Sequence, residues 1–576
     1  MNIGIDLGST YSGFARYDKN SMLVEPIALK EGEPFSIPSV VYVDSKGKVY
    51  TGYGAKNKKV RTGRFFEYFK MLLNEKDESV IASRGYDDNY TPRKITKMYL
   101  ENNLKASLKA YNDSKIEKLC ICVPEIWNDE LNTLDGRSIL IDILTKEIDI
   151  PIGHVQVVTE PEAASAFFAF NYEKETERVE AKHKTFNGYL LLIDYGGGTL
   201  DISLTEVKSS GQGSMEICCR EGCGAGENHI DSEGNRIVGN AGVSYILGVV
   251  YSAIKESEEF CDSAIDFLDP DFIEATREFE STLKSSESMD LIENYFTQFG
   301  SYSDFGEALN QKAEDFGEFT YKDEVISVSF QCLFRAYKQN IETVLAAQVR
   351  EINKRIQENL KKNPCSPSSG NNDDFKIALV GGFGGCFFVK AQLYEIYNMD
   401  ANAKNDPRVK HISTNKMELA ISLGAALIAA DRVRLQKTAK YSIGLYASDA
   451  SGRFKPYYGI KYHQIVVPNK PYFMLRDDSK RDEPGNRVVY ANLTGIKQFM
   501  IEFSGNLDSG RPMSLTPVML DKLKDLPEMH FWNCGFSVDD SDVVSFHILP
   551  SGSEDISNGK TIRLDNYSKM FNLSAW

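Results

Sequence analysis

The sequence of 576 residues predicts an α/β fold with two duplicated lobes, followed by a β-rich region. The first observation is a repeat, because Ile5–Thr10 (IDLGST) returns 188 positions later, Asp6 to Asp194, as Ile193–Thr199 (IDYGGGT). The second is an alternation of apolar strand-like runs with helical patterns up to about residue 437. The third is a change to short alternating strands beyond that point. Together they favour two related lobes and a separate C-terminal domain.

Each copy of the repeat indicates a strand, a tight glycine turn and a second strand. An apolar run precedes the turn and an alternating run follows it. Glycine allows positive φ and lets backbone N–H groups approach an anion. Asp6 and Asp194 would repel a phosphate, so their place beside such turns implies a bridging cation, most simply Mg²⁺. Two such turns predict that the lobes hold one polyphosphate between them.

The composition excludes several classes of function. A chain of this length is too long for one hydrophobic core and predicts three or more compact units. A net charge of −16 argues against a general binder of nucleic acid or anionic membranes. No apolar stretch approaches the roughly 20 residues that span a bilayer. Asp6 stands where a signal peptide would need its apolar core, which argues against secretion. Ten scattered cysteines favour buried thiols. We therefore expect a cytoplasmic protein with no membrane or nucleic-acid partner.

Helices and strands alternate through the first 437 residues. A continuous apolar run predicts a strand buried on both faces, and three- and four-residue spacing of apolar side chains predicts a helix. Polar residues 171–187 indicate a surface insertion. The expected elements are strands at 39–43, 119–124, 155–158 and 377–380, and helices at 95–111, 131–144, 161–170, 333–360 and 416–434.

Beyond residue 437 the pattern has a period of two, which indicates antiparallel sheet with one buried face. Phe499, Ile501 and Phe503 alternate in this way. The expected strands are 457–462, 488–493, 499–503 and 543–549. We place a domain boundary near residue 438.

Five motifs resemble those of the actin, hexokinase and 70-kilodalton heat-shock superfamily. They are its phosphate, hinge, connecting and adenosine motifs, and they occur in the family's order as Gly4–Tyr11, Val123–Asp129, Thr159–Ala164, Ile193–Asp201 and Leu379–Phe383. The heat-shock branch is the most similar. The resemblance implies a duplicated actin-like ATPase fold over residues 1–437. Lobe I is about 1–187 and lobe II about 188–437, with the closing helix returning to lobe I, and a β-sandwich-like domain takes up 438–576.

The resemblance also implies roles for particular residues. Asp6 and Asp194 would hold Mg²⁺. Backbone and hydroxyl groups would bind the phosphates, and they are Gly8, Ser9, Thr10, Tyr11, Gly196, Gly197, Gly198 and Thr199. Lys70 and Glu160, with Asp194 and Thr199, would carry catalysis. Taken without the resemblance, Lys70 is more simply explained as a solvated lysine, and Glu160 as a favourable charge at a helix N-terminus.

The nucleoside part departs from the family. The resemblance places Glu280, Lys284, Gly381, Gly382 and Phe383 around the base, and Phe383 lies in a segment where the family carries a stacking arginine. We therefore expect looser selectivity for adenine.

The implied function is that of a chaperone-like protein which binds ATP with Mg²⁺ and hydrolyses it slowly. Residues 438–576 would bind a peptide or protein client, and a co-chaperone or exchange factor would be a further partner. The segment 435–441 (LQKTAKY) lacks the acidic, leucine-rich linker of the family, so we expect an independent domain weakly coupled to nucleotide. The alternatives are a sugar-type kinase, an actin-like polymerising protein and an ATP-binding protein without turnover.

Overall fold

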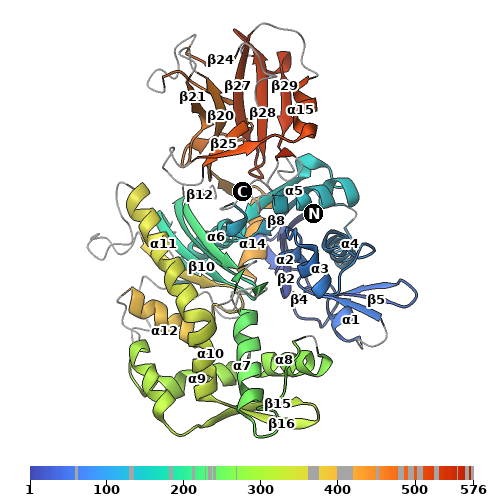
Figure 1. Cartoon of the computed structure of the whole chain (residues 1–576), viewed down its shortest axis with the longest axis vertical. Helices are drawn as coiled ribbons and strands as arrows, with labels where there is room; N and C mark the ends of the chain where they lie inside the picture. The colour runs from blue at the N-terminus through green and yellow to red at the C-terminus, as the bar shows by residue number, and fades with distance from the viewer. Residues whose placement is uncertain are drawn as a thin grey trace.

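The fold is known from a computed structural model of the chain. Figure 1 shows a two-lobed body with a β-rich region at one end and the β15–β16 hairpin at the other. The description covers the chain apart from residues 59–62, 114, 129–134, 181–185, 210–214, 227–228, 231–235, 238–241, 268, 284, 361–374, 398–418, 449–452, 478–485, 491–497, 503–509, 525–530, 554, 565–569 and 572–576.

A mixed sheet forms the centre of lobe I, in the order β3-β2-β1-β8-β9, with β4 also paired to β2. The first glycine motif makes β1 and β2 an antiparallel hairpin, and β8 and β9 run parallel to β1. The strands are β1 (Asn2–Asp6), β2 (Tyr11–Asp18), β3 (Leu23–Pro26), β4 (Ser36–Pro38), β8 (Lys118–Val123) and β9 (Val155–Thr159). Both faces of β1 and β8 are buried, which explains their continuous apolar sequence.

The central sheet of lobe II repeats this arrangement, in the order β17-β10-β11-β12-β18. The second glycine motif makes β10 and β11 an antiparallel hairpin, and β17 runs parallel to β10 as β8 does to β1. The strands are β10 (Gly188–Tyr195), β11 (Thr199–Ser209), β12 (Met215–Gly226), β17 (Phe375–Val380) and β18 (Val433–Leu435). The mixed α/β architecture predicted for this region is confirmed.

Helix α14 (Ala420–Ala429) closes the two-lobed body by packing on β1, β2, β8 and α6 (Glu160–Glu180). A Cβ on Gly4 would collide with the α14 backbone, and a Cβ on Gly424 would collide with the carbonyl of Ala163. Glycine is required at both positions because backbones meet there directly.

Two expected helix ranges need correction. Residues 433–434, predicted as the end of the closing helix, belong to β18, where they pair with β12, and residues 416–418 lie outside the described part. Residues 171–180, predicted as an insertion, continue α6. For residues 433–434, pairing with β12 outweighs the helical pattern. For residues 171–180, the polar composition does not prevent a helix, because Glu and Lys have good helix propensity.

Further helices surround the two sheets. Two π-helical segments, Ile143–Glu147 and Lys338–Glu342, continue α5 and separate α10 from α11. The α-helices are α1 (Tyr53–Lys56), α2 (Phe69–Leu72), α3 (Glu78–Ser83), α4 (Pro92–Ala110), α5 (Asp135–Asp142), α7 (Gly242–Glu256), α8 (Pro270–Leu283), α9 (Ser286–Thr297), α10 (Phe330–Tyr337), α11 (Thr343–Asn359) and α12 (Phe387–Ile396). Small sheets join β5 (Val41–Asp44) to β6 (Val49–Thr51) and β7 (Gly63–Phe66), β13 (His229–Ile230) to β14 (Arg236–Ile237), and β15 (Asp315–Tyr321) to β16 (Glu324–Ser329).

Residues beyond 437 form antiparallel sheets around their own hydrophobic cluster. One sheet has the order β21-β20-β25-β26, and the other has β23-β27-β28-β29 with β24 on β27. The elements are β19 (Lys437–Thr438), β20 (Ser442–Ser448), β21 (Phe454–Ile460), β22 (Ile465–Val466), β23 (Tyr472–Phe473), β24 (Val489–Tyr490), β25 (Gln498–Glu502), β26 (Arg511–Ser514), α15 (Pro517–Lys524), β27 (Trp532–Val538), β28 (Val544–Pro550) and β29 (Lys560–Arg563). Within the described ranges, no helix has both the length and the apolar character of a membrane span.

Candidate functional site

A cleft that is partly open to solvent lies between the lobes and takes its walls from both glycine hairpins. The sequence-predicted residues that line it are Asp6, Gly8, Ser9, Thr10, Tyr11, Lys70, Glu160, Asp194, Gly196, Gly197, Gly198, Thr199, Glu280, Gly381, Gly382 and Phe383. Lys284 lies outside the described residues. Positions almost 400 residues apart in sequence therefore converge on one cleft.

The two glycine turns face each other closely across this cleft. A Cβ on Gly197 would lie 2.6 Å from the Thr10 hydroxyl, and one on Gly198 would lie 2.6 Å from the Ser9 hydroxyl. A Cβ on Gly8 would collide with the carbonyl of Tyr11 inside its own turn. A side chain at Gly197 or Gly198 would collide with the facing hydroxyl group, so glycine allows the two turns to approach this closely.

Neighbouring elements fix each turn by hydrogen bonds. The Ser39 hydroxyl donates to the Gly8 carbonyl (2.7 Å). At the second turn, the Gly242 and Val243 N–H groups at the start of α7 donate to the carbonyls of Gly196 (3.1 Å) and Gly197 (2.9 Å). With carbonyl oxygens of the turns engaged by these donors, the turn conformations are held in place before any ligand arrives.

Carboxylates dominate the electrostatics of the cleft. The described lining holds one cationic side chain, Lys70, against four carboxyl groups, those of Asp6, Glu160, Asp194 and Glu280. Burial, followed by the charge of Glu160, raises the pKa of Asp6 to about 7. Burial and the same neighbour also raise the pKa of Asp194 well above its ordinary value. A cation in this cleft would relieve that repulsion.

Lys70 and Glu160 form a buried ion pair on the floor of the cleft. Lys70 is 2% exposed and Glu160 is 4% exposed, which rules out the alternative of a solvated lysine. Lys70 lies in the short helix α2, which begins directly after Tyr68. Tyr68 has a φ of 60°, which is unusual for a residue other than glycine. Glu160 begins α6 at the end of β9. The pair thus links two elements of lobe I.

Aromatic and apolar groups form the other end of the cleft. The ring of Phe383 packs edge-on against Tyr195 (centroids 5.1 Å apart) and is tilted against Tyr245 (5.3 Å). Its N–H donates to the Tyr195 carbonyl (2.9 Å). Phe383 is 8% exposed, so it is a fixed part of the wall. Glu280 faces the same space from α8.

Sequence reasoning missed several residues of the site. Six further residues line the cleft, namely Ser12, Ser36, Gly242, Val243, Ile246 and Ile421. Asp201, two residues after Thr199 and fully buried, accepts a hydrogen bond from the Glu125 N–H (2.8 Å). The Thr-x-Asp spacing after the second turn was a signal for Asp201. Ser36 and Ile421 have no local signal, because only the fold brings them to the cleft.

The residues suit a hydrated magnesium ion better than a fully liganded metal. In the described part of the chain, no three His, Cys, Asp or Glu side chains converge closely enough to hold a metal by themselves. Mg²⁺ commonly keeps several waters and is bound by one or two carboxylates together with phosphates. Asp6 and Asp194, buried and facing one space, fit that mode.

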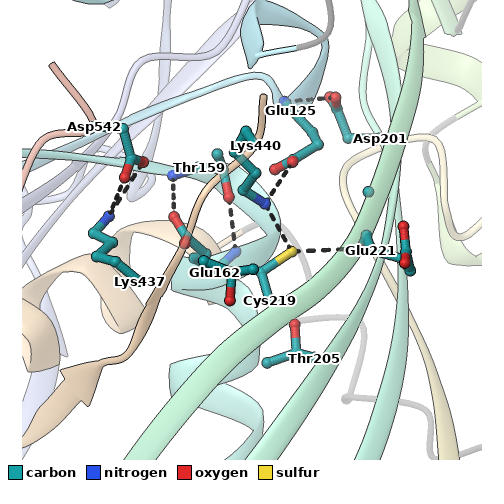
Figure 2. A network of polar contacts seen from close by, with 12 residues as sticks. Glu125, Thr159, Glu162, Asp201, Thr205, Cys219, Glu221, Lys437, Lys440 and Asp542 are labelled. Atoms are coloured by element: carbon teal, nitrogen blue, oxygen red, sulfur yellow. Dashed lines mark hydrogen bonds and ion pairs between the residues drawn. The ribbon is translucent and has the colours of Figure 1, made fainter. Parts of the chain in front are cut away.

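Figure 2 shows a second polar network, which includes Glu125, Glu162 and Lys440. The Glu125 carboxylate accepts a hydrogen bond from Lys440 (2.9 Å), whose Nζ is 3.1 Å from the Cys219 sulfur. Nearby, Lys437 pairs with Asp542 (3.1 Å). Burial tends to raise the pKa of Glu162, but Lys437, Lys440 and Arg137 outweigh it and lower that pKa to about 2. The network therefore joins the region beyond residue 437 to the strands of the cleft.

Comparison with known proteins gives matches in the N-terminal part. Residues 2–223 match the family model described as Hsp70 protein. Over 233 residues the chain is 29% identical to the chaperone protein DnaK of Thermotoga petrophila and to that of Thermotoga maritima. It is 27% identical over 234 residues to the DnaK of Thermosipho africanus. Each match covers 40% of this chain and 33% of the relative, so the chain matches about a third of the length of these relatives.

Proposed function

On the premise that the chain belongs to the Hsp70 family through residues 2–223, we propose that it binds ATP or ADP with Mg²⁺ in the interlobe cleft and hydrolyses ATP slowly. The observation that carries the proposal is the convergence of both glycine hairpins, each with its carboxylate, on the Lys70–Glu160 pair. A polyphosphate needs donors on both sides and a cation between carboxylates, and this cleft supplies the donors and the carboxylates.

The proposed division of labour follows from the positions of the groups. The turn glycines, Ser9, Thr10 and Thr199 would bind the phosphate oxygens through N–H and hydroxyl groups, because these residues line the cleft. Asp6 and Asp194 would hold the hydrated Mg²⁺. When bound, the ion supplies positive charge that offsets the charge of the phosphates and of the carboxylates.

Lys70 would neutralise charge on the terminal phosphate and position the attacking water, with Glu160 fixing the ammonium group from behind. The reaction needs little covalent help from the protein, so preorganised charge accounts for most of the catalysis. Phe383 would border the base, and Glu280 would accept hydrogen bonds from the nucleoside, because an ionised carboxylate is an acceptor only.

For residues 438–576 we propose a role in binding a peptide or protein client, in a cytoplasmic protein that acts as a chaperone. A co-chaperone or exchange factor would be a second partner. The support is the family position together with a folded unit that has its own hydrophobic cluster and two antiparallel sheets.

Calorimetry with Asp194→Asn tests the site. The variant removes one buried charge at the second turn, so we expect Mg²⁺-dependent ATP affinity to fall at least tenfold. Asp88→Asn removes the same charge from an exposed loop and is the matched control. Equal affinity for Asp194→Asn and the parent protein, with and without Mg²⁺, would contradict the assignment.

Turnover distinguishes the alternatives. Slow release of phosphate from ATP with water as the only acceptor supports the ATPase. Tight binding without phosphate release over hours would identify an ATP-binding protein without turnover. Phosphate transfer that depends on an added sugar would identify a kinase.

A further inference from the structure

The segment that joins lobe II to the C-terminal region is a single residue long. Strand β18 ends at Leu435 in the lobe II sheet, and β19 begins at Lys437 and pairs with β22 of the C-terminal region. Only Gln436 lies between them, and its N–H donates to the Ile217 carbonyl (2.7 Å). One residue spans at most about 3.6 Å. The C-terminal region therefore cannot move away unless β18 separates from β12 or β19 separates from β22.

A turn of the C-terminal region is inserted into lobe I. The turn between β27 and β28 brings Ser541 to β9, the edge strand of the lobe I sheet. The Ser541 hydroxyl accepts a hydrogen bond from the Val157 N–H (3.0 Å), and the Ser541 carbonyl accepts one from Arg137 (2.8 Å). Val543, 4% exposed, belongs to the same hydrophobic cluster as Val157. Lobe I and this turn thus share one core.

Buried charges are balanced across the junction. Asp542 lies between Lys437 (3.1 Å) and Arg137 (3.1 Å), and none of the three side chains is more than 10% exposed. Lys440 donates to Glu125 of lobe I (2.9 Å). Removing one partner of such a buried pair leaves an uncompensated charge, which is strongly unfavourable. Figure 2 shows Lys437 beside Asp542 and Lys440 beside Glu125, and separating either pair would leave a buried charge without its partner.

The C-terminal region also contacts lobe II by side chains. Thr438 lies 3.0 Å from the Cys218 sulfur, and Lys440 lies 3.1 Å from the Cys219 sulfur, both on β12. The C-terminal region thus contacts lobe I and lobe II at the same time.

We propose that the C-terminal region stays docked on both lobes with and without nucleotide, as a fixed clamp rather than a swinging domain. The missing leucine-rich linker led us to expect an independent domain. In its place, a pair of short strands and a set of buried charges make the connection. Opening of the cleft is then confined to the parts of the lobes that lie away from this junction. The inference does not rest on ATP hydrolysis.

Hydrogen exchange followed by mass spectrometry tests the proposal on the intact parent protein. The reporter peptides cover residues 436–440 and 155–159, which contain the Gln436 and Val157 amides. We expect their exchange rates to agree within threefold in nucleotide-free, Mg²⁺-ADP and Mg²⁺-ATP samples, with nucleotide binding measured separately by calorimetry. Exchange more than tenfold faster in one of these samples, or no protection in the nucleotide-free protein, would overturn the proposal.

A matched pair of variants tests the charges. Asp542→Asn keeps the shape of the turn but leaves Lys437 and Arg137 without their shared carboxylate, so the reporter peptides should exchange at least tenfold faster. Asp540→Asn, on the exposed side of the same turn, should behave like the parent. Peptides of α4 report global folding. Parental exchange in Asp542→Asn would show that the charges do not hold the junction, and if that variant unfolds, the comparison of nucleotide states still decides.

Discussion

Replacing Lys70 by Met should affect activity and stability in separable ways. The ammonium group is 2% exposed and paired with Glu160, which is itself 4% exposed. Loss of one preorganised charge at a site of phosphoryl transfer costs about 10²–10³ in rate. Loss of one partner from a buried pair also costs about 3–5 kcal/mol of stability, because the other charge stays buried. Glu160 would then face Asp6 and Asp194 without compensation.

The double variant Lys70→Met/Glu160→Gln separates the two effects. Neutralising Glu160 removes the uncompensated charge, so most of the lost stability should return while the rate stays low. The assays are single-turnover phosphate release and denaturant unfolding without nucleotide, with Lys109→Met on the exposed face of α4 as control. Turnover by Lys70→Met within threefold of the parent protein would refute the catalytic assignment. A double variant no more stable than the single one would refute the electrostatic argument.

Three further predictions concern the base, a contact between the lobes, and pH. Since the described cleft wall offers Phe383 and no arginine to the base, GTP should compete for the ATP site within about tenfold in a displacement assay; a stronger preference for ATP would show that another residue discriminates. Arg277 of lobe II pairs with Glu67 of lobe I (3.0 Å) and covers the Phe65 ring. From the usual strength of such contacts, Arg277→Ala should speed nucleotide release roughly threefold to tenfold in stopped-flow measurements. An unchanged release rate would show that this contact does not hold the lobes together around the nucleotide. The pKa of Glu162 is about 2 in the folded protein, below its ordinary 4.5, so its contribution to stability is full above about pH 4.5 and is lost as the pH falls toward 2. The difference in unfolding free energy between the parent and Glu162→Gln should therefore shrink over that range. A difference that stays constant would contradict the lowered pKa of Glu162.

Local chemistry explains which parts of the site the sequence predicts. Gly8 and Gly197 lie in turns whose geometry is encoded within a few residues, and Asp6 and Asp194 follow directly from the strands beside them. Lys70 has no such local signal, and only the family resemblance singled it out. Its burial against Glu160 brings together two residues that are 90 positions apart in sequence.

Long-range pairing explains what the sequence leaves hidden. Val433 and Arg434 continue a helical pattern, yet they form a strand because β12, about 220 positions earlier, offers its edge. Asp542 and Arg137, some 400 residues apart, give no sign in sequence that they will be buried together. The segment 435–441, read by itself, gives no sign of these contacts.

The position of α14 has a consequence for synthesis of the chain. This helix covers β1, β2 and β8, which emerge from the ribosome about 300 to 420 residues before it. At about 5–20 residues per second, one apolar face of the first sheet, with Ala15 and Cys120, remains uncovered for roughly 15–80 seconds. Each new copy of this protein thus passes through a period in which an apolar face of its first sheet is exposed and prone to aggregation.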